Sequence, residues 1–132
     1  MESWEKMEFT DRSKVLVVDD NNLNLKVATK LISKLNLEVI TASSGQECIN
    51  KILNGEKYDI ILLDDMMPEL SGKDTLLKLR KIEGFNIPVI ALTANALSGM
   101  REEYIEFGFN DYLAKPIEIK ELEKIINKYL GI

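Results

Sequence analysis

The sequence predicts an α/β fold in which a five-stranded parallel sheet is doubly wound, with five helices distributed over its two faces. Short apolar runs alternate strictly with longer amphipathic segments along the chain. The short runs are continuously apolar, as in strands buried on both faces, and the longer segments space their apolar residues as helices do. With right-handed crossovers we expect the flavodoxin-like strand order 2-1-3-4-5.

The first predicted unit follows a polar and acidic stretch, residues 1–12, which we interpret as an N-terminal arm or linker before a folded domain at 13–132. The run Val15–Val18 is too short and too rich in β-branched residues for a helix, and it predicts the first strand. Val39 and Ile40 mark the second. Helical spacing lies between them, and the residues expected to face inward there are Leu23, Val27, Leu31, Ile32 and Leu35.

The middle of the chain predicts two further strands, Ile60–Leu63 and Pro88–Leu92. Gly55 closes the helix before the third strand, in the position that glycine commonly takes after a last turn. A loop with Pro68 and Gly72 precedes the helix before the fourth strand. The expected inward residues are Cys48, Ile49, Ile52 and Leu53 on the first of these helices, and Leu76, Leu77 and Ile82 on the second.

The last third of the chain predicts a helix that stops at Gly108, a short strand at residues 112–114 and a final helix. The inward residues expected on the two helices are Leu97, Met100, Tyr104 and Phe107, then Leu122, Ile125, Ile126 and Tyr129.

Composition excludes several kinds of chemistry. The 132 residues suit one domain, and they include one cysteine, Cys48, and no histidine. An intramolecular disulfide, His-ligated zinc and Ser-His or Cys-His catalysis are therefore impossible within this chain. The formal net charge of −5 argues against nonspecific binding to nucleic acid. No apolar run nears the roughly 20 residues of a membrane span, and the polar start lacks a secretory signal, so we expect a cytoplasmic protein.

Polar residues follow four of the five predicted strands. Asp19 and Asp20 come after the first strand, Asp64 and Asp65 after the third, Thr93 after the fourth and Lys115 after the fifth. Each has an ordinary explanation when taken alone, such as helix capping for the first pair or a surface position for the lysine. In a doubly wound sheet, however, ligands bind beyond the carboxyl ends of the strands. Their joint placement therefore predicts a site.

The chemistry of that site follows from its carboxylates. Two carboxylates about 4 Å apart repel by roughly 4 kcal/mol at an effective dielectric constant of about 20, so a cation is expected among them. Oxygen donors favour Mg²⁺ over zinc or copper. A carboxylate beside such an ion can act as a nucleophile toward phosphorus, and Lys115 and Thr93 suit the phosphoryl oxygens. The site is therefore interpreted as an aspartyl-phosphate site. We expect Asp65 to be structural or solvated.

These residues resemble the receiver domains of two-component response regulators and of hybrid sensor kinases. The matching stretches are VLVVDDNNLN (15–24), YDIILLDDMMPELSG (58–72), PVIALTANAL (88–97) and FNDYLAKPI (109–117). The resemblance covers about residues 14–130, and both the order and the spacing of the motifs fit. The stretches DDNNLN and NDYLAKPI look more like receivers fused to sensor kinases than like DNA-binding regulators.

The resemblance implies a role for each site residue. The acceptor aspartate of receivers lies four residues before the proline of the next loop, which selects Asp64 over Asp65. The acidic pair maps onto Asp19 and Asp20, of which the second ligates the metal directly and the first often acts through water. The backbone carbonyl of Met66 completes the metal shell. The phosphate-pairing lysine maps onto Lys115, whose bond to Pro116 is usually cis in this family.

The resemblance also implies a switch and partners. The switch hydroxyl maps onto Thr93 and the switch aromatic onto Tyr112, which turns inward when Thr93 moves toward the phosphoryl group. This changes the surface of the fourth helix, fifth strand and fifth helix, where an effector is expected. The donor would be a phosphohistidine on a histidine kinase or histidine phosphotransfer protein. We expect no nucleic-acid or membrane partner, and no conventional turnover enzyme beyond self-catalysed phosphorylation and slow dephosphorylation.

Small departures from the family pattern bear on the lifetime of the phosphate. Asp65 is less usual after an acceptor, and neither Met66 nor Asn95 is a strong general base, so we expect an aspartyl phosphate that is not specially shortened in life. The context stays open between a single-domain regulator and a piece of a hybrid kinase.

Three other interpretations of the fold compete with this one. A non-phosphorylated pseudo-receiver would keep the fold as an interaction module, but such modules usually lose the acceptor or the acidic pair. An aspartyl-phosphate hydrolase typically carries a second acid two residues after its nucleophile, where this chain has Met66. A flavin-binding domain of the same topology would place hydroxyls and glycines where Asp19 and Asp20 would repel the phosphate.

Overall fold

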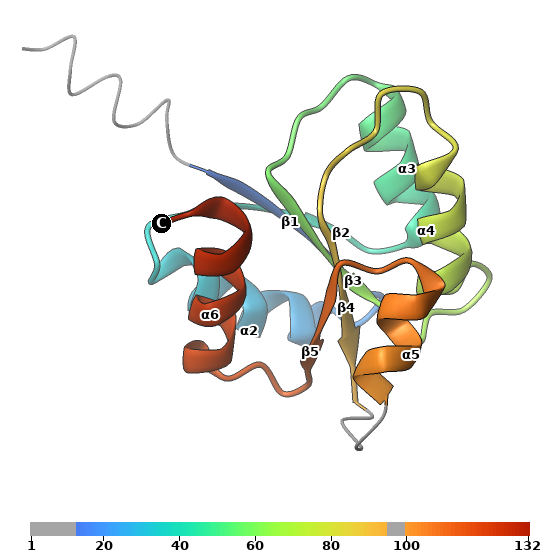
Figure 1. The fold of residues 1–132 in the computed structure, drawn as a ribbon. Coiled ribbons are helices and arrows are strands. Elements are labelled where there is room, and N and C mark those ends of the chain that lie inside the picture. The colour runs from blue at the N-terminus through green and yellow to red at the C-terminus, as the bar shows by residue number, and fades with distance from the viewer. Residues whose placement is uncertain (1–12, 95–99) are drawn as a thin grey trace, which may run out of the picture.

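The computed structural model describes residues 13–94 and 100–132 and confirms the predicted α/β architecture (Figure 1). Five parallel strands form one sheet in the order β2-β1-β3-β4-β5, as expected. The predicted arm at residues 1–12 lies outside the described residues. The strands are β1 (Lys14–Val18), β2 (Glu38–Ala42), β3 (Ile60–Asp64), β4 (Val89–Thr93) and β5 (Asp111–Ala114).

Helices cover both faces of the sheet (Figure 1). One face carries α2 (Asn22–Ser33) and α6 (Ile119–Leu130), and the other carries α3 (Gly45–Leu53), α4 (Gly72–Arg80) and α5 (Met100–Phe107). No helix in the described part of the chain combines the length and the apolar content needed to cross a bilayer.

The central strand β3 explains why the strands are continuously apolar. The first four residues of β3, Ile60–Leu63, are fully buried. Ile60 and Leu62 belong to the core beneath α2 and α6, whereas Ile61 and Leu63 belong to the core beneath α3, α4 and α5. Side chains alternate between the two faces of a strand, so every position of β3 meets a helix layer. Asp64 extends this buried strand to the carboxyl edge of the sheet.

Three of the helices are capped at their N-termini by a polar side chain. The oxygens of Asn21, Ser44 and Ser71 accept backbone hydrogen bonds from the first turns of α2, α3 and α4. Such N-caps satisfy amide groups that have no partner within a helix. The first and second of these helices therefore begin close to the carboxyl ends of β1 and β2, and the third after the loop that follows β3.

The helical spacing predicted the wrong face for part of the amphipathic segments. Exposed residues that we expected inside are Leu23, Val27, Leu53, Leu77 and Phe107. In α2 the predicted Ile32 is buried, but it is joined by Leu25 and Ala28, and in α4 Leu79 is buried beside the predicted Leu76. The spacing in α2 fits two neighbouring apolar stripes, and only the surface of the sheet selects between them. Leu97 lies outside the described residues.

Candidate functional site

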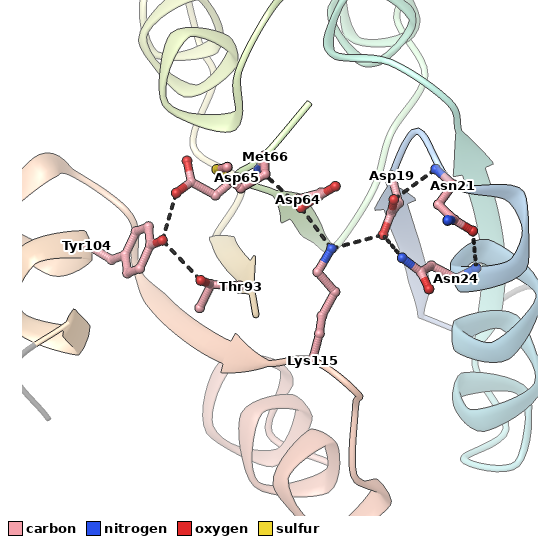
Figure 2. Close-up of polar contacts among 9 residues, drawn as sticks. All are labelled: Asp19, Asn21, Asn24, Asp64, Asp65, Met66, Thr93, Tyr104 and Lys115. Atoms are coloured by element: carbon pink, nitrogen blue, oxygen red, sulfur yellow. Dashed lines mark hydrogen bonds and ion pairs between the residues drawn. The ribbon is translucent and has the colours of Figure 1, made fainter. Parts of the chain in front are cut away.

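The predicted site residues meet at the carboxyl edge of the sheet (Figure 2). Asp19 follows β1 directly, Asp64 and Thr93 end β3 and β4, and Lys115 follows β5. These strands pair in parallel and in register, so their ends lie side by side. One oxygen from each of Asp19, Asp20 and Asp64 lies within 4.8 Å of the other two.

Asp19 is held rigidly, which the sequence analysis did not foresee. Its side chain is buried, with Oδ1 accepting a hydrogen bond from the Asn21 amide at 2.9 Å and Oδ2 accepting one from Nδ2 of Asn24 at 3.2 Å. Asn21 in turn caps α2 through the amides of Leu23 and Asn24. The segment after β1 therefore orients Asp19 and starts α2, while Asp20 beside it is exposed.

Asp64 presents one occupied oxygen and one open oxygen. It is only 2% exposed, and its Oδ1 accepts hydrogen bonds from Nζ of Lys115 at 2.9 Å and from the Met66 amide at 3.2 Å. Within residues 13–94 and 100–132 no group donates a hydrogen bond to Oδ2 of Asp64. Every buried polar side-chain atom in these residues has a hydrogen-bond partner, so Oδ2, which has none, must be in contact with solvent. Figure 2 shows Oδ2 directed away from Lys115.

The loop after β3 is packed tightly against the start of α4 through Gly72. A Cβ atom at this position would lie 2.4 Å from the carbonyl oxygen of Asp64 and 2.7 Å from Cα of Asp65. The Gly72 amide donates to the Asp65 carbonyl oxygen at 3.0 Å. The glycine permits this close backbone approach, and the approach fixes the backbone at Asp64.

Lys115 joins the two buried carboxylates. Its Nζ lies 2.9 Å from Oδ1 of Asp64 and 3.4 Å from Oδ2 of Asp19. Its amide donates to the Thr93 carbonyl oxygen at 2.8 Å, which ties the end of β5 to the end of β4. The bond from Lys115 to Pro116 is cis, as the resemblance implied.

The electrostatics of the site shift both members of this ion pair. Burial raises the pKa of Asp64, and the Asp19 charge adds to that rise, whereas Lys115 and the Met66 amide offset part of it. Burial would lower the pKa of Lys115, but its bonds and its attraction to Asp64 and Asp19 outweigh that effect and raise it. Burial and the Asp19 charge thus make the ionised form of Asp64 less favourable than in water, and Lys115 stays charged at neutral pH.

The donor set suits a hard divalent cation. Three carboxylates and one ammonium group leave a formal charge of −2, which one Mg²⁺ would cancel. Only oxygen donors converge, as Mg²⁺ prefers. The expected ligands are Asp19, Asp20 and Asp64, to which the family resemblance adds the backbone carbonyl of Met66. The Met66 side chain is 78% exposed, and a methionine sulfur is not a ligand that Mg²⁺ prefers, so the side chain is not expected to hold the cation.

Thr93, the predicted switch hydroxyl, lies on the opposite side of Asp64 from Asp19 (Figure 2). Thr93 is buried, and its Oγ1 lies 3.1 Å from the hydroxyl of Tyr104. That hydroxyl also donates to Oδ2 of Asp65 at 2.7 Å, and Asp65 is half-buried. The bond gives Asp65 a structural role, one of the two roles expected for it. Tyr112 is half-buried and stacks on Tyr104, with ring centroids 6.5 Å apart. Asn95 lies outside the described residues.

Tyr104 is the site residue that sequence reasoning missed. The helical spacing marked it as a core residue, and its ring is indeed only 3% exposed. Its hydroxyl, however, lies between two polar groups of the site. No sequence pattern signals this, because the contacts join residues 11 and 39 positions apart.

Comparison with known proteins identifies a family. A family model described as the response regulator receiver domain matches residues 15–127. The chain is 36% identical over 128 residues to hybrid signal transduction histidine kinase G of Dictyostelium discoideum. That alignment covers 94% of this chain and 4% of the kinase, so the chain spans a small part of this relative.

Two solved structures share the fold over almost the whole chain. The receiver domain of a sensor histidine kinase from Pseudomonas aeruginosa PAO1, with a magnesium ion coordinated in its active site cleft, has a TM-score of 0.80 and 35% identity, covering 92% of this chain and 99% of that one. The receiver domain of Saccharomyces cerevisiae Ssk1, in complex with the histidine phosphotransfer protein Ypd1, has a TM-score of 0.77 and 26% identity, covering 89% and 88%.

Proposed function

The chain belongs to the response regulator receiver domain family of two-component signalling, and from this premise we propose that it accepts a phosphoryl group on Asp64. The observation that carries the proposal is the open Oδ2 of a buried aspartate whose other oxygen is bound to Lys115. We also propose that a Mg²⁺ ion is held by Asp19, Asp20, Asp64 and the Met66 carbonyl. The convergence of the three carboxylates supports this.

In the proposed reaction Oδ2 of Asp64 attacks the phosphorus of a phosphohistidine on another protein or domain. The new O–P bond forms as the P–N bond breaks, and the bonding electron pair leaves with the imidazole nitrogen, which takes a proton from solvent. The product on this chain is an acyl phosphate. These 132 residues include no histidine, so the phosphohistidine lies outside them.

The surrounding residues position the transferred group and balance its charge, which is most of what phosphoryl transfer requires of a protein. Lys115, already bonded to Asp64, would pair with one phosphoryl oxygen, and the Thr93 hydroxyl would donate to another. A bound Mg²⁺ would supply charge neutralisation at the carboxylates and at the phosphoryl oxygens. Asp19, fixed by Asn21 and Asn24, holds its oxygen in place for the cation.

The partners we propose follow from the same chemistry. The donor is a histidine kinase or a histidine phosphotransfer protein, as in the complex of Ypd1 with the Ssk1 receiver. Movement of Thr93 toward the phosphoryl group, followed by Tyr112, would alter the face formed by α5, β5 and α6, where an effector binds. We propose that the life of the Asp64 phosphate is not specially shortened, because the exposed Met66 side chain offers no general base beside it.

The direct test is covalent labelling. The protein is mixed with acetyl phosphate and Mg²⁺, and its intact mass is measured. The expected result is a gain of one phosphoryl group in the wild type and in the matched control Asp65→Asn, and no gain in Asp64→Asn or after removal of Mg²⁺ with EDTA. A wild type that stays unlabelled would support the other candidate, an interaction module that is never phosphorylated. A half-life of seconds for the label at neutral pH would contradict the expected lifetime of the phosphate.

A further inference from the structure

Three hydrogen bonds close a ring between Asp19 and the first turn of α2 (Figure 2). Oδ1 of Asp19 accepts from the Asn21 backbone amide at 2.9 Å, and Oδ1 of Asn21 accepts from the Asn24 backbone amide at 3.1 Å. The Asn24 side chain completes the ring, because its Nδ2 donates to Oδ2 of Asp19 at 3.2 Å. An ionised carboxylate only accepts hydrogen bonds, so the side-chain nitrogen of Asn24 must face it. The start of the helix therefore holds the Asn24 side chain against Asp19.

Asn24 and Lys115 share one oxygen of Asp19. Nζ of Lys115 lies 3.4 Å from Oδ2 of Asp19, the oxygen to which Asn24 donates, and 2.9 Å from Oδ1 of Asp64. Within the described residues these are the two donors to Oδ2 of Asp19. Asp19 is only 2% exposed, and a buried acceptor that loses its donors costs free energy. If one donor leaves, the bond to the other therefore becomes more important.

The proposed reaction requires one of these donors to move. Lys115 pairs with a phosphoryl oxygen once Asp64 is phosphorylated, and its contact with Asp19 is the longer of its two contacts. Asn24 is held in the first turn of α2, so its donor stays beside Asp19. We propose that Asn24 is a positioning residue, which keeps Asp19 bonded in place when Lys115 turns from Asp19 to the phosphoryl group. The inference rests on the proposed function, because it needs Lys115 to change partner.

Asn24 should then matter more after phosphorylation than before it. In the unphosphorylated protein, removal of Nδ2 leaves Oδ2 of Asp19 bonded to Lys115. In the phosphorylated protein, the same removal leaves this oxygen without either donor, because Lys115 has moved. The loss of the Asn24 donor thus destabilises the phosphorylated form more than the unphosphorylated form. A side chain that served only the folding of α2 would destabilise both forms equally.

The first test measures the rate of labelling by acetyl phosphate with Mg²⁺ in excess. Asn24→Leu removes the donor and keeps the size of the side chain. Asn22→Leu is the matched control, because Asn22 is another exposed residue at the start of the same helix. We expect Asn24→Leu to slow labelling about fivefold, the factor that corresponds to one hydrogen bond, because Lys115 contacts the phosphoryl group during the transfer. Asn22→Leu should change the rate less than about twofold.

The second test measures the sharing of Asp19 without a phosphoryl group, by thermal unfolding in EDTA. With Lys115 present, Asn24→Leu should lower Tm by less than about 2 °C, because Lys115 still bonds to Oδ2 of Asp19. Lys115→Met removes the ammonium group and keeps most of the stem. In that background Asn24→Leu should lower Tm by about 4 °C more than it does with Lys115 present, because Oδ2 then loses its last donor.

The outcomes separate this inference from the proposed function. If the wild type is labelled and Asn24→Leu is labelled at the same rate, the role given to Asn24 is wrong and the proposed function stands. The same conclusion follows if Asn24→Leu lowers Tm equally in the two backgrounds. If the wild type takes no label, both are wrong. Should the double variant not fold, the labelling rate of Asn24→Leu against that of Asn22→Leu decides alone, and equal rates would refute the inference.

Discussion

The replacement Asp64→Asn should stabilise the protein in the absence of Mg²⁺. The substitution keeps the size of the side chain and its hydrogen bond from the Met66 amide, but it removes one negative charge from the cluster. Lys115 retains Asp19 as a partner at 3.4 Å. The Asp64 charge is attracted by Lys115 and repelled by Asp19 and Asp20. Whether its removal stabilises the protein therefore depends on whether the repulsion is larger than the attraction.

The distances decide that sign. At an effective dielectric constant of about 20, the Lys115 ammonium 2.9 Å away attracts the Asp64 carboxylate by about 6 kcal/mol. Each of the other two carboxylates, at 4.8 Å or less, repels it by at least about 3.5 kcal/mol. The two repulsions exceed the attraction by about 1 kcal/mol. Burial of Asp64 adds to this difference, and solvent screening of the exposed Asp20 subtracts from it. The raised pKa of Asp64 has the same sign.

Thermal unfolding in EDTA at pH 7 measures the effect. A gain of about 1 kcal/mol corresponds to a rise in Tm of about 4 °C for a domain of this size. Glu83→Gln is the matched control, because it removes one exposed charge remote from the cluster and should leave Tm unchanged. With Mg²⁺ at about 100 times its Kd the wild type should gain about 2.7 kcal/mol and overtake the variant. A variant that unfolds at or below the wild-type temperature in EDTA would refute the reasoning.

Three other substitutions test separate parts of the structure. Gly72→Ala should lower both stability and Mg²⁺ affinity, measured by unfolding and by calorimetric titration, because its Cβ would lie 2.4 Å from the Asp64 carbonyl oxygen; unchanged affinity would contradict the tight loop. Met66→Ala should leave the Mg²⁺ affinity within about twofold, because only its backbone is proposed as a ligand, whereas Asp20→Asn should weaken it about tenfold or more. Asp111→Asn should cost about 1 kcal/mol at pH 7. Burial raises the pKa of Asp111, but its bonds to Arg101 and Lys128 contribute to a net lowering below the usual 3.8. The stability that the Asp111 charge contributes should therefore be lost as the pH falls below about 4, so the difference between wild type and Asp111→Asn should shrink there.

The sequence predicted the strand order because short apolar runs alternate strictly with amphipathic segments, and right-handed crossovers then leave few arrangements of a doubly wound sheet. The convergence of Asp19, Asp64 and Lys115 followed from that order alone. The rotation of α2 could not be predicted in this way. Its exposed face carries Leu23 and Val27, so apolar spacing gave no unique direction, and the sheet determines which stripe is buried.

The contacts that orient the site were also beyond the sequence. Asn24 is recognisable as polar, but its bond to Asp19 depends on how α2 leaves the strand. The hydroxyl of Tyr104 is a stronger example, since a residue expected in the core contributes a polar group to the site edge. Spacing predicts which side of an element a residue occupies, whereas the partner of a single polar atom depends on tertiary packing that no local pattern records.

The placement of Asp64 shows why this site and this core occur together. A buried carboxylate that is repelled by two neighbours destabilises the fold, here by about 1 kcal/mol before a cation binds. The strand that ends in Asp64 buries Ile60–Leu63 completely, and each such side chain contributes about 1.5–3 kcal/mol. The apolar run therefore offsets the cost of the acid several times over. A shorter or more polar β3 would leave less margin, and the aspartate could then be tolerated only in an exposed position, where Lys115 and the tight Gly72 loop could not hold one oxygen and leave the other open.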